Sequence, residues 1–144
     1  MPKSTSASNS ILALIFNATT WNLIAENDST SPATNLYLSL HTADPGVGGS
    51  QTTNETAYTN YARIAIVRTT SGWDVPSSGA TANAALAQFA QCGASGATLT
   101  HVAIGTDASG TGLVLYAGAL TSSLAVANGI QPQFAAGALD VTES

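Results

Sequence analysis

The stretch 35-NLYLSLHTADPG-46 decides the fold class. Its first half alternates, so that Leu36, Leu38 and Leu40 would lie on one face of an extended chain and the residues between them on the other. The letters DPG at 44–46 have the composition of a tight turn. The stretch therefore predicts a β-strand that ends in a turn.

The same pattern recurs to the end of the chain. Short apolar or alternating runs are separated by Gly, Pro, Asn and Asp every eight to twelve residues. The segment 81–90 is rich in alanine, but Thr81, Asn83 and the neighbouring runs favour an extended chain over a helix. This spacing is typical of a β-sandwich, a jelly roll or a small barrel with about eight strands. The expected strands after the first are 60–69, 73–75, 81–90, 97–106, 112–120, 121–127 and 130–142.

One segment before residue 35 has a helical pattern. Asn9 or Ser10 can cap a helix over residues 9–25. Apolar residues then follow at spacings of three and four and form one stripe, namely Ile11, Leu14, Ala18, Trp21 and Ala25. We therefore divide the chain into an N-terminal arm with a helix, residues 1–25, and a β-sandwich body, residues 26–144.

The charge of the chain excludes several classes of function. Only 8% of its 144 residues are charged, the net charge is −5, and the basic side chains are Lys3, Arg63 and Arg68. A protein that neutralises phosphates needs clustered Lys and Arg, so we expect no direct binding to nucleic acid. No run approaches the roughly 20 apolar residues of a membrane helix, so we expect no membrane partner. A neutral polar surface can be buried without desolvating many ions, which favours a subunit of an assembly.

No group of residues predicts catalysis or a cofactor. His41 and His101 each precede an acid, Asp44 and Asp107, and the four side chains could form a metal site only if the two strands were neighbours. Both histidines fit better as structural residues that hydrogen-bond the backbone. Cys92 is the only cysteine and has no nearby base or cation, so we expect a buried, inert thiol. The sequence thus predicts no catalytic, cofactor-binding or metal-binding residue.

The two arginines and the aromatic residues are the candidates for contact with a partner. In a chain this poor in cations, we expect Arg63 and Arg68 each to pair with an acid, on opposite faces of one strand. Aromatic residues and arginine dominate many contact energies. For Trp21 and Trp73, packing in the core is an equally good interpretation. The interface candidates are Lys3, Trp21, Tyr37, Tyr58, Tyr61, Arg63 and Arg68.

Several stretches in one order resemble a known family. They are LYLSLHTADPG, NYARIAI, GWDV, THVAIGTDASGTGLVLYAGAL and GIQPQFAAGALDV, and the likeness covers about residues 9–142. The chain resembles small structural proteins of tailed bacteriophages that are described either as capsid decoration proteins or as tail-fibre proteins. The resemblance implies a virion component without catalytic activity. By analogy with small β-rich cement proteins, it also implies a jelly-roll-like sandwich.

The resemblance leaves the place in the virion open between two alternatives. We expect a cement protein on the outer capsid surface, which binds the major capsid protein and itself as a dimer or trimer, with residues 1–25 reaching to a neighbour. The alternative is a tail-fibre or receptor-binding component, with the loop 46–57 as its contact. A third interpretation, an enzyme that degrades host polysaccharide, would need two carboxylates that converge in a cleft.

Overall fold

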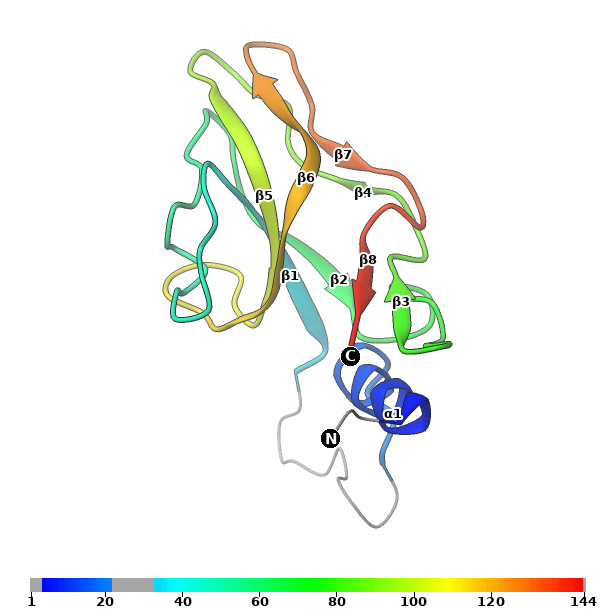
Figure 1. The fold of residues 1–144 in the computed structure, drawn as a ribbon. Coiled ribbons are helices and arrows are strands. Elements are labelled where there is room, and N and C mark those ends of the chain that lie inside the picture. The colour runs from blue at the N-terminus through cyan, green and yellow to red at the C-terminus, as the bar shows by residue number, and fades with distance from the viewer. Residues whose placement is uncertain (1–3, 22–32, 144) are drawn as a thin grey trace. The chain divides into compact units, whose positions relative to one another are not determined.

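The computed structural model describes residues 4–21 and 33–143. The fold is mainly β, with one helix in the described residues (Figure 1). The elements are α1 (Thr5–Phe16), β1 (Asn35–His41), β2 (Ile64–Val67), β3 (Ala80–Ala82), β4 (Ala87–Gln88), β5 (Ala97–Gly105), β6 (Val114–Val126), β7 (Gln133–Phe134) and β8 (Asp140–Thr142). The sheets are open and sandwich-like and do not close into a barrel. The predicted fold class, about eight strands after one N-terminal helix, is confirmed.

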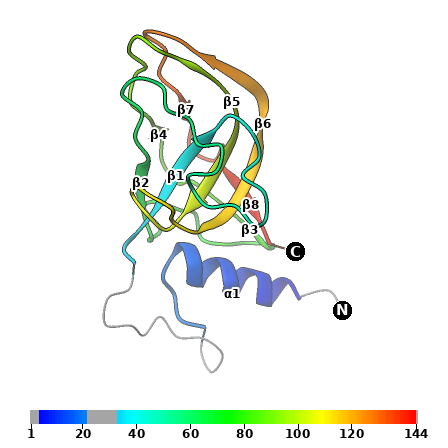
Figure 2. The ribbon, with the colours of Figure 1, turned by 90° about the vertical axis from the view of Figure 1, so that its left-hand side faces the viewer.

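The largest sheet has four strands in the order β2-β1-β5-β6. β5 runs antiparallel to both neighbours. Ile104 of β5 lies opposite Leu38 of β1, and Ala103 of β5 lies opposite Ala117 of β6. β5 and β6 lie side by side, with β6 on the outer side of this sheet (Figures 1 and 2). Two further sheets pair β3 with β8 and β4 with β7.

Most predicted strands exist, but their lengths differ from the prediction. The run 60–69 contributes only Ile64–Val67 as β2. The runs 112–120 and 121–127 form one strand, β6, whose pairing with β5 shifts register between Leu99 and His101. The segment 81–90 is extended, as predicted, in β3 and β4.

The chain forms two compact units, which are described separately. Unit 1 comprises Met1–Asn35, Ile66–Ala87 and Phe134–Ser144, and unit 2 comprises Leu36–Ala65 and Gln88–Gln133. The predicted boundary between residues 25 and 26 lies outside the described residues.

The prediction of a helix over residues 9–25 is wrong at both ends. The helix begins at Thr5, because the side chain of Ser4 accepts a hydrogen bond of 3.2 Å from Ala7 N. It ends at Phe16, because Asn17 caps it and Ala18 adopts a positive φ of 52°. The buried positions are Ser8, Leu12 and Phe16, so the helix presents a different face from the predicted stripe.

Each unit has its own buried aromatic contact. In unit 1, Phe16 of α1 meets Trp73 edge-to-face at 4.6 Å between ring centroids, and both side chains are 0% exposed. In unit 2, Tyr61 lies 5.2 Å from Tyr58 and 6.2 Å from Phe89. Trp73 therefore packs in the core of unit 1, and Tyr58 and Tyr61 pack against each other in unit 2. Among the described residues, no helix has the length and apolarity needed to cross a membrane.

Candidate functional site

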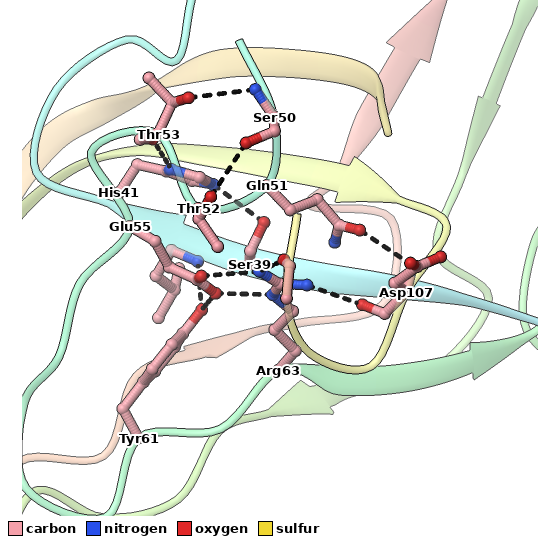
Figure 3. A network of polar contacts seen from close by, with 12 residues as sticks. Ser39, His41, Ser50, Gln51, Thr52, Thr53, Glu55, Tyr61, Arg63 and Asp107 are labelled. Carbon is pink, nitrogen blue, oxygen red and sulfur yellow. Dashed lines mark hydrogen bonds and ion pairs between the residues drawn. The ribbon is translucent and has the colours of Figure 1, made fainter. Parts of the chain in front are cut away.

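Unit 2 contains a dense network of polar side chains at the end of β1 (Figure 3). After His41 the chain turns at residues 44–46, where Asp44 Oδ1 accepts a hydrogen bond of 2.8 Å from Gly46 N. It then runs back along β1, with Thr56 N donating to Leu40 O at 2.9 Å. This return brings Glu55 opposite His41. The turn predicted from the DPG letters therefore positions the network.

An ion pair between Glu55 and Arg63 is the centre of this network. Arg63 Nε donates to Glu55 Oε1 and Arg63 Nη2 donates to Glu55 Oε2, both at 2.7 Å, so the contact has two parallel hydrogen bonds. The side chains are only 3% and 15% exposed. The hydrogen bonds to Glu55 raise the pKa of Arg63. Tyr61 OH also donates to Glu55 Oε1, at 2.8 Å, and burial raises the pKa of Tyr61 well above its usual value.

Arg63 also connects the network to the turn between β5 and β6. Its Nη1 donates to Asp107 O at 3.0 Å and its Nη2 donates to Gly110 O at 2.7 Å. A planar guanidinium can serve several acceptors at once, which an ammonium on a flexible stem cannot do in this geometry. The arginine therefore holds two loops, residues 42–57 and 106–113, against each other.

His41 is fully buried and both of its ring nitrogens have partners. Nδ1 lies 2.9 Å from Thr53 O and Nε2 lies 2.9 Å from Ser39 Oγ. A carbonyl oxygen only accepts, so Nδ1 carries the proton and Nε2 of the neutral ring accepts from the Ser39 hydroxyl. Burial lowers the pKa of His41 and favours this neutral form. His41 therefore hydrogen-bonds the backbone of the 42–57 loop, as the sequence predicted.

Gln51 links the 42–57 loop to the loop between β5 and β6. Its backbone N donates to Gly112 O at 2.8 Å, and its Oε1 accepts from Asp107 N at 2.9 Å. The side chain is 0% exposed and occupies space that two glycines leave open. A Cβ at Gly105 or at Gly112 would overlap the Gln51 amide group. Glycine at these positions is thus a packing requirement.

The network has little capacity for chemistry. β1 and β5 are neighbours, and His41 lies directly opposite His101. The acids do not complete a metal site, because Asp44 caps its own turn and no group of three or more metal-ligating side chains occurs among residues 4–21 and 33–143. The carboxylate of Glu55 is already shared by Arg63 and Tyr61. What the arrangement does is fix two loops to the sheet.

The structure places the interface candidates in different settings. Lys3 lies outside the described residues. Tyr58 is 3% exposed and donates to Ala90 O at 2.9 Å, and Tyr61 and Arg63 belong to the network. Trp21 and Tyr37 are half-buried. Whether any of them meets a partner stays a prediction.

Arg68 is half-buried and binds backbone carbonyl groups of unit 1. It makes no ion pair that the described residues record, and instead donates to Leu14 O at 2.7 Å, Ile15 O at 2.6 Å and Ala33 O at 2.6 Å. The first two are carbonyl groups of the last turn of α1, which have no partner within the helix. A cation there is also favoured by the helix dipole. The expected pairing with an acid is thus confirmed for Arg63. For Arg68, the acceptors among the described residues are backbone carbonyl groups.

Unit 1 contains an open groove of about 320 Å³ along the exposed side of α1. Its lining residues are Ser6, Asn9, Ser10 and Ala13 of α1, then Asn17, Thr19, Thr70, Val75 and Pro76. None of the lining side chains titrates near neutral pH. The groove can therefore offer hydroxyl and amide groups to a partner, but no general acid or base.

Glu55 and Gln51 are residues of the network that the sequence did not single out. Each is distant along the chain from part of what it holds: Glu55 precedes Arg63 by a loop, and Gln51 binds beside Asp107. The scarcity of cations was the one available signal, since it required an acid for Arg63 among eight candidates. It did not say which acid.

Comparison with known proteins identifies the family of this chain. No curated protein matches this chain. A family model described as podophage GP4 fiber I protein gp80 matches residues 2–142, which is nearly the whole sequence. The resemblance to phage structural proteins is thereby confirmed. The chain belongs to the family of the podophage GP4 fiber I protein gp80, a family of phage structural proteins.

Proposed function

We propose that this chain is a non-enzymatic subunit of a tail fibre in a podophage virion. The single observation that carries the proposal is the match to a fibre protein family over residues 2–142. The word fiber in that description supports the tail-fibre alternative more directly than the capsid-cement role that we expected from the sequence. A cement role on the outer capsid surface, bound to the major capsid protein, remains the rival.

The geometry supports a part that works by contact. The ionisable side chains of the network are all bound to one another or to the backbone of unit 2, namely Glu55, Arg63 and His41. Their bonds hold the loops 42–57 and 106–113 in fixed positions on the sheet. A weakly charged unit whose loops are held on its sheet suits a subunit that works through contact with its neighbours.

The location in the virion tests the proposal. Purified virions are imaged by cryo-electron microscopy with a specific antibody fragment as a marker, and the copies of this chain per virion are counted against the major capsid protein by mass spectrometry. A few copies per virion with the marker at the tail support the fibre role. Hundreds of copies with the marker over the capsid shell would refute it in favour of cement.

A second measurement tests the absence of catalysis. The purified chain is incubated with polysaccharide from the host surface, and new reducing ends are counted. We expect no turnover above that of heat-denatured protein. Turnover above that control that co-purifies with the chain would contradict the proposal, because it would mean that the folded chain catalyses cleavage of the polysaccharide.

A further inference from the structure

The connection between β6 and β7 contains the pair Asn128-Gly129, and no other asparagine of the sequence precedes a glycine. The side-chain amide of an asparagine can be attacked by the backbone nitrogen of the residue that follows. Glycine has no Cβ, so it leaves this nitrogen more accessible than any other residue does. Asn128 is therefore the asparagine with the highest intrinsic reactivity in this sequence.

The structure holds this pair in a tight turn of unit 2. Asn128 and Gly129 are both exposed, so water reaches them. Ile130 N donates to Ala127 O at 2.9 Å, which closes a turn of four residues. Gly129 has a φ of 87°, whereas Asn128 is not among the residues with positive φ. These are the features of a type II turn with glycine at its third position.

This turn keeps the backbone nitrogen of Gly129 away from the Asn128 side chain. In a type II turn, the second residue has a ψ of about +120°, which directs the next nitrogen away from its Cβ. Gly129 N also donates to Cys92 O at 2.9 Å, and Gly129 O accepts from Gln91 Nε2 at 2.8 Å. The nitrogen can attack only after the peptide group has rotated and these bonds have broken. The folded chain therefore opposes the reaction that its sequence favours.

We propose that Asn128 is a site of spontaneous deamidation and that the hydrogen bonds of the 127–130 turn slow the reaction in the folded chain. Gly129 N forms a bond to Asn128 Cγ, and the bond from Cγ to Nδ2 breaks. The amide nitrogen leaves as ammonia and takes up the proton that Gly129 N loses. Water then opens the resulting succinimide ring at either carbonyl group, which leaves aspartate or isoaspartate at position 128. Nothing is oxidised or reduced.

The products would alter the contacts of this turn. Either one adds a negative charge to a chain whose net charge is already −5. Isoaspartate also takes its Cβ into the main chain and so lengthens the turn by one atom. The bonds from Ile130 N to Ala127 O and from Gly129 N to Cys92 O then cannot both keep their lengths. The inference does not depend on whether the virion carries the chain on its tail or its capsid.

The test is incubation of the purified chain at mildly alkaline pH, in buffer and in urea that unfolds it. The chain is then digested with a protease that cuts beside aromatic residues, and deamidated peptides are separated and counted by chromatography with mass spectrometry. In the unfolded chain, we expect Asn128 to convert before every other asparagine. In the folded chain, we expect its conversion to be at least about tenfold slower, because the turn must first open.

A matched pair of variants tests the part that the hydrogen bonds play. Gln91→Ala removes the bond to Gly129 O and should raise the rate in the folded chain about two- to fivefold. Gln88→Ala makes the same truncation at another exposed glutamine, whose Nε2 donates to Gln133 Oε1 at 2.9 Å and not to the turn. It should leave the rate within about 1.5-fold of that of the wild type.

Three results would overturn the inference. The first is equal rates of conversion at Asn128 in the folded and the unfolded chain. The second is another asparagine that converts before Asn128 in the unfolded chain. The third is an equal effect of Gln91→Ala and Gln88→Ala on the folded chain. The comparison of folded and unfolded wild-type chain gives an answer even if a variant fails to fold.

Discussion

Replacing Glu55 by glutamine would remove one charge from the centre of the network and leave the size of the side chain unchanged. The glutamine oxygen can still accept at most two of the three hydrogen bonds that the carboxylate now accepts from Arg63 and Tyr61, because two of them end on Oε1. Its amide group, however, must face either an N–H of Arg63 or the hydroxyl of Tyr61. The guanidinium, which is 3% exposed, would then be buried without its counter-ion.

The expected loss of stability follows from these contacts. Removing one partner of a buried ion pair typically costs about 3–5 kcal/mol. Arg63 keeps its two bonds to Asp107 O and Gly110 O, which reduces the penalty. We expect Glu55→Gln to lower the free energy of unfolding by about 2–4 kcal/mol, equivalent to a fall in Tm of about 6–12 °C.

The position of the tryptophans makes the assay specific. Trp21 and Trp73 both belong to unit 1, whereas Glu55 and Arg63 belong to unit 2. Urea unfolding is followed by far-UV circular dichroism, which reports on both units, and by tryptophan fluorescence, which reports on unit 1. If the units unfold separately, Glu55→Gln should shift the dichroism transition to lower urea and leave the fluorescence transition in place.

Two comparisons decide whether the reasoning holds. Asp74→Asn makes the same charge change at an exposed side chain and should change stability by no more than about 0.5 kcal/mol. The effect of Glu55→Gln should persist at about 1 M salt, because buried pairs are screened less than exposed ones. A loss below about 1 kcal/mol, or one that salt abolishes, would show that the pair behaves as a surface contact and would refute the argument.

Three further predictions concern other positions. His41 has a lowered pKa, so the unfolded chain takes up a proton that the folded chain does not. The free energy of unfolding should therefore fall as pH drops below 6.5, by at most about 1.4 kcal/mol per pH unit. Urea titrations at several pH values should show this fall for the wild type and a smaller one for His41→Gln. Arg68→Lys keeps the charge but loses the planar guanidinium that binds the end of α1. It should lower the free energy of unfolding by about 1–2 kcal/mol, as measured from the tryptophan fluorescence transition in urea. An unchanged midpoint would contradict the role of Arg68 in closing the helix. Gly105→Ala should lower the free energy of unfolding by about 1–3 kcal/mol, because the new Cβ overlaps Gln51. Gly48→Ala, whose Cβ meets open space, should change it by no more than about 0.5 kcal/mol in thermal unfolding. Equal effects of the two variants would refute the packing argument.

The strands were predictable because their signal is local. Leu36, Leu38 and Leu40 alternate in the sequence and are buried in β1, and the turn that follows has the residues that such a turn needs. Cys92 was expected to be buried and is 2% exposed. The family was recognisable because these strand-and-turn patterns occur in a fixed order.

The helix and the network depended on contacts that are distant in sequence. The run after Ser10 offers more than one apolar stripe, and the one that is buried passes through Leu12 and Phe16 because Phe16 meets Trp73. Nothing local indicated that Arg68 would close the last turn of α1. In the same way, Glu55 became the partner of Arg63 only because the 42–57 loop folds back along β1.

The internal use of both arginines has a consequence for proteolysis. Trypsin needs a basic side chain in its specificity pocket, and this sequence offers only Lys3, Arg63 and Arg68. Arg63 is clamped by Glu55 and Arg68 by the end of α1, so neither can enter a protease pocket while the fold is intact. Even after denaturation, trypsin would leave residues 4–63 and 69–144 as two very long peptides, so counting this chain in virions requires a protease that cuts beside aromatic or aliphatic residues.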